Sequence, residues 1–365
     1  MSGALRAPGP TEPVPAPDSA STPAPAPAVS RAVLVPEPGV HRLVRRAVPR
    51  PGPGEVRLRV AAAGICLSDR ELYEGHRAPG YVRYPVVPGH EWSGTVEAVG
   101  PGGDPALVGR GAVAEGFRSC GDCERCRGGE TSLCTGGYAE TGFTEPGAFA
   151  DHVVVPARLL HLLPDGADLR AAALLEPAAV VTAAVRAGRP RPGERIAVVG
   201  AGTLGLLAVQ LLAASSPAAL TVVEPRAARG ERALAQGATG VLAPGEAEAA
   251  AHGRFDLVVE TAGAPTTAAS SCLLARRGGR VVLTGMFTEG AVGIDPVHLS
   301  VSQLEVRSVF GASSADWAGA VAAFGEGVLD PGALISHEFP LERFAEALAL
   351  VGGGDPGTGK VLLRP

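Results

Sequence analysis

The sequence predicts an α/β protein in which a strand-rich part precedes a doubly wound parallel sheet. Residues 31 to about 160 contain short runs of alternating apolar and polar residues between Gly and Pro, which is typical of half-buried antiparallel strands. From about residue 171, apolar runs without alternation are separated by helical segments, as in a parallel sheet covered on both faces. A glycine-rich turn joins the first of these runs to a helix, which favours a dinucleotide-binding sheet.

Length and composition limit the classes of function. The chain has 365 residues, enough for two domains, and is 46% apolar with 50 Gly and 33 Pro. No apolar run reaches the roughly 18 residues needed to cross a bilayer. The net charge of −5 gives no reason to expect a nucleic acid or an anionic membrane as partner. We therefore expect a small-molecule partner.

The first 30 residues are mostly Pro, Ala and Ser, which cannot bury apolar surface, so we expect a disordered tail. This tail holds one Arg and no continuous apolar core, unlike a secretory signal. Four of the six cysteines lie within fifteen residues, and the chain is not a small Cys-dense domain held by disulfides. Metal ligation in a reducing cytoplasm is the favoured explanation.

The elements follow in order along the chain. The strand-rich part begins at Arg31 and includes runs at 55–60 and 94–100. An Ala-rich helix is expected from about Arg170 to Ala187, ended by the Pro190–Gly193 segment. Further strands are expected at 196–199, 220–223, 255–259, 280–284, 305–310 and 360–363, and helices at 203–214, up to 234, at 317–324 and at 341–351. The last strand can pack on the first domain, which would make the parallel sheet an insertion.

The glycine-rich turn is Gly200-Ala-Gly202-Thr203-Leu204-Gly205, a G-x-G-x-x-G motif between an expected strand and an expected helix. The first Gly permits the tight turn, the second admits a pyrophosphate close to the backbone, and the third allows close helix–strand packing. The helix N-terminus would face the phosphates. The alternative is a structural Gly-rich turn.

Glu224 lies nineteen residues after Gly205, at an expected strand end. There it would accept hydrogen bonds from the adenosine ribose and repel a 2′-phosphate, which favours NAD. Arg226 and Arg229 lie close by, so NADP stays open. The alternative is a surface Glu.

Four thiols have the spacing C-x2-C-x2-C-x7-C, at Cys120, Cys123, Cys126 and Cys134. Four thiolates can complete a tetrahedral zinc site with no open position, which makes such a site structural. An iron–sulfur cluster and unligated cysteines are the alternatives.

A second metal site is expected around His90 and Glu91. Imidazole and carboxylate are both zinc ligands, although such a pair on a surface loop is common. Cys66, twenty-four residues earlier, supplies a thiolate, and its alternative is a small buried hydrophobe. Ser68 and Asp69 follow it, and such polar neighbours fit a site better than a core.

Glu176 completes this expected ligand set. It lies in an Ala-rich stretch, where an isolated buried carboxylate would be costly without a partner. With Cys66 and His90 it would leave a fourth position for water or a substrate oxygen, for which Glu91 can compete. Asp69 is expected to accept from the other ring nitrogen of His90.

Together these motifs resemble the zinc-dependent medium-chain dehydrogenase/reductase family from about residue 31 onward. The resemblance implies a GroES-like catalytic domain over 31–179 and 313–365, a structural-zinc lobe at about 118–136, and a Rossmann domain over 180–312. It implies two zinc ions per subunit, NAD or NADP, and dimers or tetramers. Ser68 would start the proton relay from the substrate hydroxyl, although Leu67 departs from the Gly or His often found there.

Glu176, where simple-alcohol enzymes carry a Cys, resembles the polyol and threonine branch of the family. Three stretches are most similar to 2-deoxy-scyllo-inosamine dehydrogenases of aminoglycoside biosynthesis, at 84–94, 140–144 and 334–341. This narrower resemblance implies oxidation of an aminocyclitol alcohol, from 2-deoxy-scyllo-inosamine to 3-amino-2,3-dideoxy-scyllo-inosose. The alternatives are another polyol, sugar or threonine-type dehydrogenase, a reductase of an assembled keto aminoglycoside, and a zinc-free, NAD-sensing or quinone-reductase-like relative.

Overall fold

The computed structural model describes residues 29–287, 290–355 and 357–365. The tail expected over 1–30 lies outside these residues, except for Val29 and Ser30, which begin the first strand. Among the described residues, no helix combines the length and apolar character needed to cross a membrane.

The first domain is built on a seven-stranded sheet with the order β14-β15-β3-β4-β5-β7 and with β6 paired to β3. A separate hairpin of β1 and β2 lies beside it. The bounds of the strands are β1 Val29–Glu37, β2 Val40–Ala47, β3 Glu55–Ile65, β4 Glu91–Val99, β5 Gly111–Ala114, β6 His152–Pro156, β7 Leu160–Leu162, β14 Ile335–Pro340 and β15 Lys360–Arg364. The helices are α1 Leu67–Glu74, α2 Glu124–Arg127, α3 Leu169–Ala172 and α11 Phe344–Leu350.

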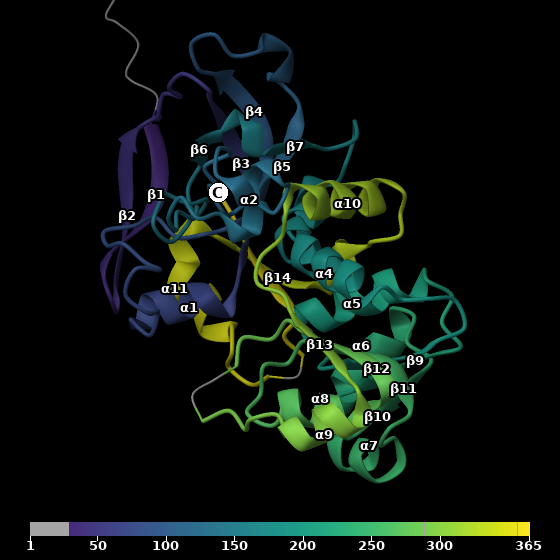
Figure 1. Ribbon diagram of the computed structural model, residues 1–365. Coiled ribbons are helices and arrows are strands. Elements are labelled where there is room, and N and C mark those ends of the chain that lie inside the picture. The colour runs from purple at the N-terminus through teal and green to yellow at the C-terminus, as the bar shows by residue number, and fades with distance from the viewer. Residues whose placement is uncertain (1–28, 288–289, 356) are drawn as a thin grey trace, which may run out of the picture.

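The C-terminal strand β15 pairs antiparallel with β3, so the end of the chain completes the sheet of the first domain. Figure 1 shows these last segments, in yellow, returning beside the purple and blue strands. Alternation explains β3, because Val56, Leu58 and Val60 are buried while the residues between them are more exposed.

The second domain contains a parallel sheet with the strand order β10-β9-β8-β11-β12-β13 and helices around it (Figure 1). This is the doubly wound order of dinucleotide-binding domains, so the predicted fold class is confirmed. The strands are β8 Arg195–Val199, β9 Ala219–Val223, β10 Gly240–Leu242, β11 Phe255–Glu260, β12 Ala275–Leu283 and β13 Glu305–Ser308. The helices are α4 Leu175–Gly188, α5 Thr203–Ala213, α6 Ala227–Ala235, α7 Pro244–Ala250, α8 Thr267–Leu274, α9 Pro296–Ser302 and α10 Ser314–Gly325.

The single helix expected from Arg170 to Ala187 is wrong in one respect. The chain forms two helices there, α3 and α4, with a break at Ala173 and Leu174. Pro177 has no N–H to donate to the carbonyl of Ala173, so a continuous helix would lack that bond, whereas Pro is tolerated in a first turn. The break places Glu176 in the first turn of α4.

Helix α10 packs on α4 through a buried carboxylate. Asp316 accepts hydrogen bonds from Arg186 at 2.7 and 3.0 Å, and from the backbone N–H of Ser313 at 2.9 Å. Burial alone would raise the pKa of Asp316, but the bonds from Arg186 and Ser313 outweigh it and hold this pKa below its usual 3.8. The resulting stabilisation is fully present above pH 3.8, the usual pKa of Asp, and is lost as the pH falls through the lowered pKa.

We expect Asp316→Asn to lower the free energy of unfolding by about 1–2 kcal/mol, because the capping and ionic bonds weaken together. The loss should be equal at about pH 6 and pH 8, since the native carboxylate is ionised at both. Urea unfolding at the two pH values measures it, with Glu326→Gln at the exposed end of α10 as control. A loss confined to one pH would contradict the ionic explanation.

Candidate active site

Strand pairing brings three donor groups together at one end of the first-domain sheet. Cys66 follows β3, His90 precedes β4, and Glu91 pairs with Gly64 across the two strands. The donor atoms of Cys66, His90 and Glu91 lie within 4.8 Å of one another. Thiolate, imidazole and carboxylate at this separation suit zinc.

Asp69 orients two of these residues. As the third residue of α1 it accepts a hydrogen bond from the backbone N–H of Cys66 at 2.8 Å, which closes a capping box. Its other oxygen lies 3.2 Å from Nδ1 of His90. A carboxylate on Nδ1 leaves Nε2 free to bind a metal, as is usual for metal-binding histidines. Ser68 is half-buried in the same first turn.

A turn over residues 140–147 packs against the backbone beside His90. Gly142 has a φ of +89°, and a Cβ there would lie 2.8 Å from the backbone carbon of Gly89. Gly89 itself has a φ of +100°, and a Cβ on it would meet the Phe149 ring at 2.4 Å. This close packing places the Phe143 ring 4.8 Å from the His90 ring.

Lys360 is a residue of this site that the sequence interpretation missed, although it is the only Lys in the chain. It is the first residue of β15, is 5% exposed, and forms an ion pair with Glu91. Gly64 must lack a side chain, because a Cβ there would lie 2.9 Å from Cε of Lys360 and closer still to Glu91. Oε2 of Glu91 contacts the ammonium group but forms no hydrogen bond of normal geometry with a described residue.

Glu176 lies beside the three donors without joining their 4.8 Å group among the described residues. Burial, together with the Glu91 and Glu140 carboxylates and partly offset by His90, raises the pKa of Glu176 to about 7. Burial likewise raises the pKa of Glu140 to about 7. The sequence interpretation had not placed Glu140 here. Carboxylates crowded in a low-dielectric site favour a bound cation.

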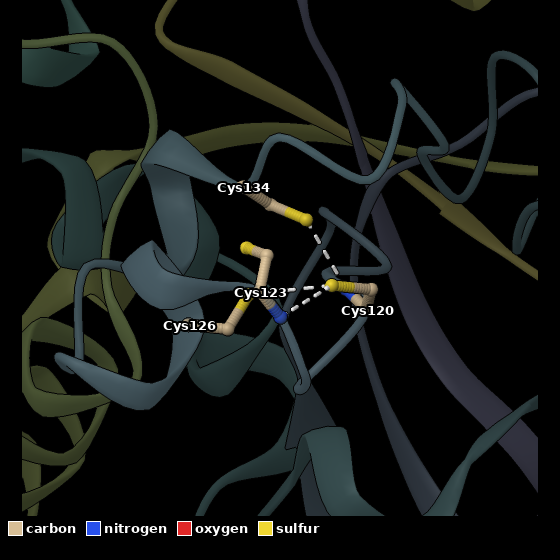
Figure 2. A group of neighbouring side chains, drawn as sticks. All are labelled: Cys120, Cys123, Cys126 and Cys134. Atoms are coloured by element: carbon tan, nitrogen blue, oxygen red, sulfur yellow. Dashed lines mark hydrogen bonds between the residues drawn. The ribbon is translucent and has the colours of Figure 1, made fainter.

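Figure 2 shows the side chains of the four-Cys lobe converging on one point, with their sulfur atoms within 4.8 Å of one another. Backbone N–H groups donate to the sulfurs, from Cys123 to Cys120 and from Cys120 to Cys134, both at 3.3 Å. Hydrogen bonds from the Thr135 and Cys126 backbone lower the pKa of Cys123 to about 5. Such an arrangement favours thiolates around a tetrahedral metal.

The glycine-rich turn joins β8 to α5, and the N-cap of α5 is Gly202. Gly200 has a φ of +98°, and a Cβ on Gly205 would lie 2.0 Å from the Gly200 carbonyl oxygen, so both positions require glycine. A Cβ on Gly202 would meet nothing within 4 Å, which leaves its face open for a ligand. Thr203 and Leu204 form the first turn of the helix, whose free N–H groups suit a pyrophosphate.

Glu224 follows β9 and is 7% exposed. It accepts hydrogen bonds from the backbone N–H of Ala201 at 2.9 Å and of Arg226 at 3.1 Å, which holds it against the glycine-rich turn. Arg229 is half-buried, and burial lowers its pKa, as does the nearby Arg226 charge. The acidic and basic residues predicted to discriminate a ribose hydroxyl from a 2′-phosphate therefore lie together.

The fold and these sites define a zinc-dependent, nicotinamide-linked oxidoreductase. Residues 52–165 match the alcohol dehydrogenase GroES-like domain, and residues 203–326 match the zinc-binding dehydrogenase domain. The chain is 34% identical over 316 residues to 2-dehydro-3-deoxy-L-galactonate 5-dehydrogenase of Pseudoalteromonas atlantica, covering 84% of this chain and 91% of the relative. It is 31% identical over 345 residues to L-threonine 3-dehydrogenase of Pyrococcus horikoshii, covering 91% and 97%.

Solved structures agree. A zinc-binding dehydrogenase from Sinorhizobium meliloti bound to NADP has a TM-score of 0.86 and 28% identity, covering 93% of this chain and 100% of that one. A thermostable alcohol dehydrogenase from Pyrobaculum aerophilum with cobalt and zinc has a TM-score of 0.84 and 31% identity, with the same coverage. The chain therefore belongs to the zinc-dependent medium-chain dehydrogenase family, acts on CH–OH groups, and uses zinc with NAD or NADP.

Proposed function

We propose that this dehydrogenase oxidises a secondary alcohol of a polar substrate of the polyol, sugar or threonine type. The observation that carries the proposal is the acidic metal site, in which Glu91 and Glu176 accompany Cys66 and His90. The relatives act on a sugar acid and on threonine by name, which supports a polar substrate.

Each residue has a proposed role. Cys66 and His90 hold the catalytic zinc, with Glu91 or Glu176 as the carboxylate ligand, and the four-Cys lobe holds a second, structural zinc. Bound zinc supplies Lewis acidity that lowers the pKa of the substrate hydroxyl. Asp69 orients His90, and Ser68 carries the released proton outward. The glycine-rich turn holds the cofactor that accepts the hydride.

The finer proposal is that an aminocyclitol alcohol is the substrate, for which the three stretches at 84–94, 140–144 and 334–341 are the support. The test measures zinc content and then cofactor absorbance with an aminocyclitol, sorbitol and threonine. About two zinc per chain and reduction of NAD or NADP by one of these alcohols are expected. One zinc per chain without turnover would contradict the proposed function, and turnover of sorbitol or threonine alone would contradict only the finer proposal.

Glu224→Ala is expected to weaken the preference for NAD over NADP. The variant removes the carboxylate that would bind the ribose hydroxyls and repel a 2′-phosphate, while Arg226 and Arg229 remain. We expect the ratio of kcat/KM for NAD to that for NADP to fall about 10- to 100-fold. Glu231→Ala, on an exposed part of the neighbouring helix α6, is the control. An unchanged ratio would show that Glu224 only supports the turn.

We also propose a cytoplasmic homo-oligomer formed through the nucleotide domain. Among the described strands β13 is at the edge of the parallel sheet, and on α9, the helix before it in the chain, Val297 and Val301 are 66% and 62% exposed. An open strand edge beside exposed apolar side chains suits pairing with a second copy. Light scattering after size-exclusion chromatography tests it, and a monomer at micromolar concentration would contradict it.

A further inference from the structure

The turn over residues 140–147 carries a buried carboxylate that neither the metal ligand set nor the cofactor site uses. Glu140 is 7% exposed, and its backbone carbonyl accepts hydrogen bonds from three residues of its own turn. These bonds fix the backbone of the turn, and the side chain of Glu140 is held by Tyr138 and Arg77.

One oxygen of Glu140 is satisfied and the other is not. Oε2 accepts a hydrogen bond from the Tyr138 hydroxyl and lies 3.4 Å from the Arg77 guanidinium. Among the described residues no hydrogen bond reaches Oε1. Oε1 is not one of the fully enclosed side-chain atoms of the described residues that lack a partner, so it is open to a donor from solvent or from a ligand.

Arg77 does not offer its own charge to a substrate. It donates to the Tyr81 carbonyl at 3.1 Å and to the Tyr138 hydroxyl at 3.0 Å, and its guanidinium lies 3.6 Å from the centre of the Phe143 ring. Its side chain is 14% exposed. Arg77 therefore holds Glu140 in place, and the free acceptor Oε1 is what remains for recognition.

The turn that carries Glu140 borders the metal donors, because Gly142 packs on the backbone of Gly89 next to His90. Phe143, on the same turn, lies between Arg77 and the His90 ring, 4.8 Å from the latter. The Glu140 charge raises the pKa of Glu176, and the His90 charge lowers the pKa of both carboxyls. The carboxylate of Glu140 therefore belongs to a turn that lies next to the place where an alcohol would be held.

We propose that Glu140 is a specificity-determining residue that accepts a hydrogen bond from a second donor on the substrate, a hydroxyl or an ammonium group vicinal to the oxidised hydroxyl. This inference rests on the proposed function and narrows its substrate class to vicinal diols and amino alcohols. A charge-assisted hydrogen bond in a buried site discriminates strongly against an analogue that lacks the donor.

Three probes differ only in the vicinal group, namely cyclohexanol, trans-1,2-cyclohexanediol and trans-2-aminocyclohexanol. With zinc-loaded enzyme, kcat/KM is expected to be at least about 10-fold higher for the two donor-bearing probes. In Glu140→Gln it should fall about 10- to 100-fold for those probes, mainly through KM, and change less than about 3-fold for cyclohexanol. A larger loss for the amino alcohol than for the diol identifies ammonium as the preferred donor, a larger loss for the diol identifies hydroxyl, and equal losses show that either donor serves.

Glu145→Gln is the matched control, because Glu145 lies on the same turn but faces Arg118, 4.0 Å away. Glu145→Gln should leave kcat/KM unchanged for all three probes. Both variants should retain the zinc content and melting temperature of the wild type. If Glu140 were only structural, Glu140→Gln would lower kcat/KM equally for all three probes or for none of them. Either result overturns the inference. If the probes are not oxidised, they are tested as inhibitors of the oxidation of the best alcohol among the aminocyclitol, sorbitol and threonine. Glu140→Gln should then raise the inhibition constants of the two donor-bearing probes and leave that of cyclohexanol unchanged. If the wild-type enzyme oxidises that alcohol and Glu140→Gln shows no selective loss, the inference about Glu140 is wrong and the proposed function still stands.

Discussion

Cys66→Ser is expected to abolish turnover while leaving NAD binding measurable. Cys66 supplies the thiolate of the donor group shared with His90 and Glu91, and a serine hydroxyl is a poor zinc ligand. Without the Lewis acid, kcat/KM should fall roughly 1,000-fold or more. The zinc content should fall from about two ions per chain to one, because the four-Cys lobe has its own set of ligands and keeps its zinc. Metal analysis and cofactor binding by fluorescence measure both effects.

Cys272→Ala is the control, because Cys272 is a buried cysteine in the core of the second domain. It should keep both zinc ions and activity within a few-fold of wild type. If Cys66→Ser retained normal turnover, the catalytic metal site would have to be assigned elsewhere.

Cys134→Ser should remove the other zinc and destabilise the protein. Loss of one of four thiolates opens the lobe, since a site of this kind is formed by its metal and has little apolar core of its own. The lobe also contacts helix α10, where Thr131 accepts a hydrogen bond from the Ser314 N–H at 3.1 Å. We expect the free energy of unfolding to fall by more than about 3 kcal/mol.

Calorimetry with metal analysis measures this loss, and Ser132→Ala, in the lobe but not a ligand, is the control. Retention of two zinc ions and an unchanged melting temperature would refute a structural site. Iron with visible absorbance in the wild-type protein would indicate the iron–sulfur alternative.

Local patterns account for most of the fold. The change from alternating to uniformly apolar strands near residue 171 predicts the two sheets, because a strand exposed on one face alternates and a strand covered on both does not. Glycines at 200 and 205 predict the cofactor turn, since both positions exclude a side chain. The break between α3 and α4 was missed because Ala-rich sequence has strong helix propensity, and Pro177 alone marks the interruption.

The candidate site was predicted where its residues stand in a recognisable motif or, for Glu176, where a carboxylate lies in an Ala-rich stretch. The Cys lobe and the His90-Glu91 pair have recognisable local spacing. Lys360 and Glu140 do not, since they lie 269 and 49 residues from Glu91. Lys360 reaches Glu91 through strand pairing, and the turn that carries Glu140 packs beside His90.

By itself, the sequence determined the fold class, the family and the residue types that can hold zinc and a dinucleotide, because periodicity and ligand chemistry are local properties. Only the tertiary structure decided how the charges of the site are arranged. Antiparallel pairing of β3 with both β4 and β15 brings Glu91 to Lys360, and the packing of glycines 89 and 142 brings the turn that carries Glu140 beside His90. Contacts between residues so far apart in the chain depend on sheet order and backbone approach, which no single stretch of sequence specifies.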